Sequence, residues 1–286
     1  MRHLATPLAV AIVVVVLYQR ILDSAYLEFG TVPRYPTRGH LPSPRAISRR
    51  ALANAVPATT SVAAVVLVFT APFRVWVWGV VGLLAVTVAL SPVLAVFHYD
   101  VRPLTPAEAE TVQTVIPALD CEVLAVTGTR NGPVNGYAIG GPFRDVVGVS
   151  EFALATLPPA QLAALLAHEA CHHRERHVLV RGGVSVVVLA VGAAVTTTLF
   201  DALVPLSTLS LLVTIAVERV AAYGAMRWLE YRADAAAVQH TSAHAVASLL
   251  TSLGATTDVD QPEGSWLLQL FSTHPAYADR IARFGQ

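Results

Sequence analysis

Long apolar runs alternate with polar segments along this chain. Crossing a bilayer takes about 20 mainly apolar residues. Four runs approach that length or exceed it, at 4–22, 56–97, 184–200 and 203–222. The second run is interrupted only at Pro72–Arg74, so we expect two short spans joined by a turn at that point. The pattern therefore predicts five transmembrane helices.

These spans divide the sequence into membrane and polar parts. Residues 1–22 form a first span or signal anchor, 57–98 and 184–222 form two transmembrane hairpins, 23–56 is an Arg- and Pro-rich loop, and 99–183 and 223–286 are polar. A cleaved signal peptide is the alternative for 1–22. No small-residue cleavage site follows Leu17, however, where Tyr18, Gln19 and Arg20 come next.

The placement of arginine predicts the orientation in the membrane. The outer turns of the two hairpins offer only Arg74 and Asp201, whereas the segment 19–57 is rich in arginine, with Arg20, Arg34, Arg38, Arg45, Arg49 and Arg50. By the positive-inside rule that loop is cytoplasmic. A hairpin returns to the side it left, so both polar parts, 99–183 and 223–286, are expected on the same cytoplasmic face.

The polar part 99–183 has the patterning of a small α+β domain. Thr105 begins a predicted helix that runs to Leu119, with Pro106 at its first position and Glu108 three residues after the cap. Three strand-like runs follow, separated by turn residues, at Cys121–Thr127, Val134–Ile139 and Asp145–Val149. From Pro159 the pattern becomes helical through about Val180.

Composition agrees with a membrane protein. Hydrophobic residues make up 55% of the chain and charged residues 13%, with a mean hydropathy of +0.58. A soluble domain would carry about 25% charged residues. The formal net charge is zero, so no basic field suggests nucleic acid as a partner. Two cysteines are too few for a disulfide framework. The expected environment is the lipid bilayer of a cell membrane.

The motif His168-Glu169-Ala170-Cys171-His172 is the main candidate for chemistry. On a helix, residues four apart share one face, so the imidazoles of His168 and His172 reach a single zinc ion. Glu169 is offset toward a metal-bound water and is suited to act as general base. Chance is the alternative for a five-residue match in a chain with ten histidines.

A third ligand is predicted from the segment after the last span. Glu230 returns to the same membrane face as the histidines, and two His with one Glu is a common catalytic zinc set. Asp234, one turn later, is placed to accept a hydrogen bond from a ligand imidazole. The alternative is an exposed helix on which these acids pair with Arg227 and Arg232. The set predicts one Zn2+ per chain.

Four motifs in order resemble the HtpX-like and CAAX-prenyl-protease type of integral-membrane zinc metallopeptidases. They are Asn135-Gly136-Tyr137-Ala138-Ile139-Gly140-Gly141, the His168–His172 motif, the Glu230 and Asp234 pair, and His274-Pro275 followed by Arg280-Ile281. Two departures stand out. Gly136 replaces the usual alanine, and three spans precede the catalytic domain where the heat-shock members usually have two. The larger prenyl-protein proteases carry more spans, so their substrate class is not expected here.

The resemblance implies a gluzincin-like catalytic domain built from 99–183 and 223–286. It implies that the strand carrying Asn135, Gly136, Tyr137 and Ala138 pairs with the substrate backbone. His274 is then a catalytic candidate that holds substrate or stabilises the oxyanion. Arg280 is a substrate-binding candidate, with a structural salt bridge to Asp279 or a neighbouring acid as the alternative.

The predicted protein is an α-helical multi-pass membrane protein with an α+β gluzincin-like zinc metallopeptidase domain. We expect an endopeptidase that cleaves protein and peptide substrates, and the resemblance implies membrane proteins undergoing quality control as the main substrate class. A catalytically silent membrane sensor or scaffold is the alternative. A dedicated processing protease would need a sensing domain for which no segment is long enough. An intramembrane site-two protease would need an LDG-type motif, which the sequence lacks.

Overall fold

The computed structural model describes residues 59, 62–63, 66, 71–127, 134–139, 145–202, 204–256 and 274–284. The predicted first span at 1–22, the loop at 23–56 and most of the first arm of the 57–98 hairpin lie outside these described residues.

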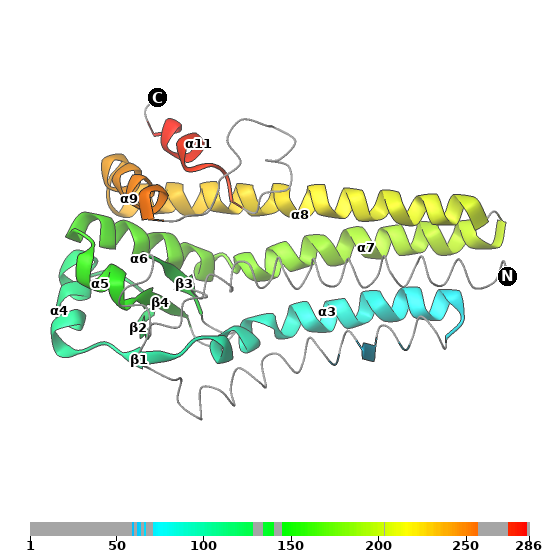
Figure 1. Cartoon of the computed structure of the whole chain (residues 1–286), viewed down its shortest axis with the longest axis horizontal. Coiled ribbons are helices and arrows are strands. Elements are labelled where there is room, and N and C mark those ends of the chain that lie inside the picture. Colours follow the sequence, from blue (N-terminus) through cyan, green and yellow to red (C-terminus); the bar gives the residue numbers. More distant parts are fainter. Residues whose placement is uncertain are drawn as a thin grey trace.

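Three long helices run side by side away from the end of the molecule that carries the sheet (Figure 1). They are α3 (Phe73–His98), α7 (His177–Ala202) and α8 (Val204–His240). Within the described residues, these three are long and apolar enough to cross a membrane. They correspond to three of the five predicted spans.

The outer faces of α7 and α8 are apolar and exposed. Val187, Val191 and Val195 form one stripe on α7 at four-residue spacing, with exposed fractions of 48–62%. Leu209, Leu212, Val213, Val217 and Val220 are similarly exposed on α8. An apolar surface of this length suits lipid better than water.

The two outer turns lie at the same end of the helices, as the hairpin prediction requires. The rings of Phe73 at the start of α3 and Phe200 near the end of α7 stack with centroids 3.9 Å apart. Small residues allow close helix packing, because a Cβ atom at Gly192 would lie 2.0 Å from Thr214 on α8. Close approach at small residues is typical of helices packed in membranes.

The opposite end carries a four-stranded sheet with the order β1-β2-β4-β3. The strands are β1 (Val101–Pro103), β2 (Glu122–Val126), β3 (Gly136–Ala138) and β4 (Val146–Ser150). β2 and β4 pair in parallel, and the other two pairings are antiparallel. The three predicted strands are confirmed, whereas β1 is too short to have shown a pattern.

Helix α4 (Pro106–Val115) begins as the sequence predicts. The Thr105 hydroxyl accepts from the Glu108 backbone N–H, and the Glu108 carboxylate accepts from the Thr105 N–H, which completes a capping box. The predicted end at Leu119 is wrong, because the helix ends at Val115. A second short helix, α5 (Glu151–Thr156), is capped by the Ser150 hydroxyl.

The core of this domain surrounds α6 (Pro159–Arg174). Leu162, Leu166 and Ala164 on α6 are almost fully buried, together with Val147 of β4 and Leu250 of α9 (Ala243–Thr256). The small helix α11 (Tyr277–Ala282) packs beside α9 (Figure 1). Burial on nearly all sides holds α6, and therefore its histidines, in one position.

The predicted helix from Pro159 to Val180 is interrupted. α6 ends at Arg174 and α7 begins at His177, with Arg176 in the left-handed region at φ 51°. A left-handed residue ends a helix and changes the direction of the chain. The prediction of one continuous helix was therefore wrong, and His177 starts a new helix instead of ending the old one.

Candidate active site

Helices α6 and α8 bring the three predicted metal ligands together. His168 and His172 lie one turn apart on α6, and their Nε2 atoms are 3.1 Å from each other. Glu230 on α8 faces both, with Oε2 3.6 Å from His168 Nε2 and Oε1 3.5 Å from His172 Nε2. Glu230 lies beyond the lipid-facing stretch of α8. With a helical rise of 1.5 Å per residue, it is about 39 Å along the helix from Val204.

The spacing of these donor atoms fits a zinc ion. Tetrahedral bonds of about 2.0–2.1 Å separate neighbouring ligand atoms by about 3.3 Å. The observed separations of 3.1–3.6 Å bracket that value. His168 and Glu230 are only 9% and 5% exposed, so the donors are held by packing. Two imidazoles and one carboxylate also leave a fourth position for water.

The two imidazoles have opposite electrostatic surroundings. Burial lowers the pKa of His172 well below its ordinary value, which favours the neutral form that binds metal. Burial also acts to lower the pKa of His168, but the hydrogen bond to Asp234 and the nearby carboxylates outweigh it and raise the pKa. A metal ion would compete for that imidazole with a proton.

Asp234 lies where the sequence predicts it. Its Oδ1 is 3.1 Å from His168 Nδ1, the nitrogen that points away from the metal-facing side. Arg280 of α11 donates to both Asp234 oxygens at 2.6 and 2.8 Å and also lies 3.1 Å from Glu230. Arg280 is 4% exposed, which favours the salt-bridge alternative over substrate binding.

Glu169 packs directly on the first residue of β3. A Cβ atom at Gly136 would lie 2.6 Å from Glu169 Cγ and 3.0 Å from Oε1. The predicted general base therefore lies between the zinc helix and the predicted substrate strand. Gly136, noted from the sequence only as a departure from the usual alanine, provides the space for this side chain.

Of the other predicted site residues, His274 lies beside the metal ligands, and the rest lie on or next to β3. His274 lies with Nε2 3.6 Å from Glu230 Oε1, and its side chain is 42% exposed. β3, with Tyr137 and Ala138, is the terminal strand of the described sheet. Asn135 precedes it, and its backbone carbonyl accepts from Ser150 N–H. The terminal position of β3 is compatible with pairing to an extended peptide.

Sequence reasoning missed a group behind His172, consisting of His177, Glu175 and Arg232. His177 Nδ1 lies 2.7 Å from His172 Nδ1. The H-x4-H spacing was visible, but in a continuous helix five residues turn the second ring about 140° away. The helix break at Arg176 turns the His177 ring back toward His172.

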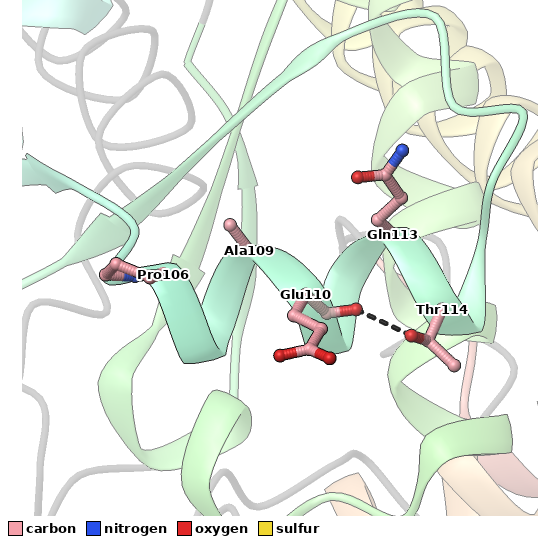
Figure 2. Close-up of a pocket in the computed structure, with 5 residues that line it drawn as sticks. All are labelled: Pro106, Ala109, Glu110, Gln113 and Thr114. Atoms are coloured by element: carbon pink, nitrogen blue, oxygen red, sulfur yellow. Dashed lines mark hydrogen bonds between the residues drawn. The ribbon is translucent and has the colours of Figure 1, made fainter.

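An open hollow of about 460 Å³ lies along α4, and Figure 2 shows the residues that line it. Pro106, Ala109, Glu110, Gln113 and Thr114 line it. None of the candidate site residues is among them, so the hollow is separate from the metal centre.

The fold and the donor set are those expected of a membrane metallopeptidase. The model of peptidase family M48 matches residues 109–285, and the chain belongs to this family. This membership confirms the resemblance drawn from the four motifs.

A solved structure shares the fold. The crystal structure of Ste24p from S. mikatae is similar, with a TM-score of 0.57 and 16% sequence identity, over 82% of this chain and 63% of that chain. This chain therefore spans less than two thirds of the length of Ste24p. No curated protein matches this chain.

Proposed function

We propose that this protein is a zinc-dependent endopeptidase that cleaves membrane proteins at the cytoplasmic face, as part of their quality control. The observation that carries the proposal is the trio His168, His172 and Glu230, whose donor atoms have the spacing of a zinc site. The base candidate Glu169 shares α6 with both histidines and lies against the terminal strand β3.

His168, His172 and Glu230 would hold the metal, which supplies Lewis-acid polarisation and a water that is acidic near neutral pH. The Glu169 carboxylate accepts a proton from the attacking water and delivers it to the leaving amide nitrogen. The partly exposed His274 imidazole donates a hydrogen bond to the oxygen of the scissile carbonyl as negative charge develops there. β3 aligns the substrate backbone by strand addition.

Location supports the substrate class. The site is attached to the long helices α7 and α8, whose apolar outer faces fit a bilayer. A peptide segment next to the membrane is therefore the substrate with the shortest path to the site. The substrate segment must be extended, because strand pairing forms hydrogen bonds with its main chain.

The test is zinc content and casein cleavage by detergent-purified protein. Wild type is expected to hold one zinc ion and to cleave. Glu169→Gln should keep zinc and lose activity by 10²-fold or more, roughly the scale of general-base catalysis. Glu230→Ala should lose metal. Glu110→Gln, an exposed carboxylate on α4, serves as the matched control and should behave like wild type.

Two other outcomes would contradict the proposal. If wild type binds no zinc, the metal site is wrong. If wild type binds zinc but cleaves no substrate, the silent sensor or scaffold becomes the better interpretation.

A further inference from the structure

The nitrogen of His172 that faces away from the metal site is the first member of a chain of contacts. His177 Nδ1 lies 2.7 Å from His172 Nδ1, and His177 Nε2 lies 3.1 Å from Glu175 Oε2. Arg232 of α8 then donates to both Glu175 oxygens at 2.6 Å. This chain of contacts runs from a buried ring to an exposed guanidinium, since His177 is 4% exposed and the Arg232 side chain is 47% exposed.

Proton positions along this chain follow from the metal site. A neutral His172 that binds metal through Nε2 carries its hydrogen on Nδ1. That N–H can only donate to His177 Nδ1, which must then be the acceptor. His177 consequently carries its hydrogen on Nε2 and donates it to Glu175. Every donor meets an acceptor, and the terminal carboxylate is neutralised by Arg232.

We propose that His177, held by Glu175 and Arg232, is a positioning residue that fixes the tautomer and ring orientation of His172 for metal binding. This inference rests on the proposed zinc site. His177 touches neither substrate nor metal and acts only through His172. Outer hydrogen-bond partners of ligand imidazoles typically change metal affinity 10–100-fold when removed.

The helix break makes this arrangement possible. α6 ends at Arg174, Arg176 is left-handed, and α7 starts at His177. The turn brings the His177 ring edge-on to His172, with centroids 4.7 Å apart. The contact with Arg232 also ties this joint to α8, the helix that carries Glu230. One network thus joins α6, α7 and α8 beside the site.

A second metal site is the competing interpretation of the same residues. Cys171, Glu175 and His177 offer ligand atoms within 4.8 Å of one another. Metal on His177 Nε2 would leave that ring without a hydrogen while it still accepts from His172, which requires an imidazolate. Arg232 also occupies both Glu175 oxygens. Proton balance therefore favours the hydrogen-bond chain.

The experiment measures zinc affinity by competition with a chelator on full-length protein in detergent. His177→Ala should weaken zinc binding 10–100-fold. His177→Asn should restore most of the affinity, because its amide oxygen lies near the position of Nδ1 and accepts from His172. Glu175→Ala should have an intermediate effect. His173→Ala removes a neighbouring imidazole on the same turn and should leave zinc affinity unchanged, even if it lowers Tm.

Zinc affinity of His177→Ala within twofold of wild type would overturn the proposal. Binding of two zinc ions by wild type, with one lost in both His177→Ala and Cys171→Ser, would replace it with the second metal site. These failures differ from failure of the proposed function, in which wild type itself binds no zinc or Glu230→Ala keeps it.

Discussion

Gly136 and Glu169 are in direct contact, although they belong to different elements of the domain. The first residue of β3 has no side chain, and the carboxylate arm of Glu169 fills the space that a Cβ atom would take, with Cγ 2.6 Å from that position. The relatives that the sequence resembles usually have alanine here. In this chain, glycine at position 136 leaves room for the side chain of Glu169, the candidate general base, to pack against the strand.

Gly136→Val should therefore displace the Glu169 carboxylate and lower kcat at least tenfold, with zinc content unchanged, since the three atoms nearest to an added Cβ all belong to Glu169. Gly136→Ala should have a smaller effect, because rotation of the Glu169 side chain can accommodate one methyl group. Casein cleavage and metal analysis check both. Gly224→Ala is the control, because nothing lies within 4 Å of its added Cβ. Wild-type kcat in Gly136→Val would show that the contact is unimportant.

The ion pair of Arg280 with Asp234 is almost completely buried, at 4% and 1% exposed. Arg280→Ala leaves the carboxylate without its partner, which typically costs about 3–5 kcal/mol. We expect a marked fall in Tm and weaker zinc binding, since Asp234 orients His168. Arg280→Lys should be intermediate, because one ammonium cannot match two oxygens. A variant with unchanged Tm and only a raised KM would instead support the substrate-binding role.

Several features were predictable because their causes are local. The capping box at Thr105 and Glu108 lies within four residues, and the spans follow from apolar runs alone. His168 and His172 meet because helix periodicity dictates it. Predicting the roles of Glu230 and Asp234 required more information. It needed a continuous helix that returns to the correct membrane face, together with the four ordered motifs.

Other features depend on contacts that no local pattern shows. β1 has three residues and forms only by pairing with β2. The clearance at Gly136 exists only because α6 passes over β3. The joint at Glu175–Arg176 also escaped prediction, because neither glycine nor proline marks it. Arginine in the left-handed region is uncommon, and tertiary contacts such as Glu175 with Arg232 hold it there.

That joint leads to a stability prediction. Arg176 at φ 51° costs about 1–2 kcal/mol relative to the right-handed region, whereas glycine adopts this conformation freely. Arg176→Gly should raise Tm or leave it unchanged, with zinc affinity preserved. Arg176→Val should lower Tm, because β-branched residues tolerate positive φ least. Thermal unfolding of the purified variants decides, and a large loss of stability in Arg176→Gly would show that the arginine side chain itself is needed.

Acid should weaken the start of α4. The hydrogen bond from Arg102 lowers the pKa of Glu108 to about 2 from its usual 4.5. The carboxylate therefore stabilises the folded state above pH 4.5, and this contribution is lost as pH falls toward 2. Glu108→Gln should reduce Tm at pH 6, and its difference from wild type should shrink as pH approaches 2. A difference that does not vary with pH would mean that the charge makes no contribution.

The predicted orientation has a direct test in a bacterial host. Phe73 and Phe200 place both outer turns at one end of the helices, opposite the sheet and the metal site. Because the arginine-rich segment lies before these helices, the turn between α7 and α8 should be outside and Gln286 inside. Alkaline phosphatase inserted at that turn should be active, and green fluorescent protein after Gln286 should fluoresce. The matched control, phosphatase after Gln286, should be inactive. Active phosphatase at Gln286 would place the metal site outside the cytoplasm and exclude cytoplasmic cleavage.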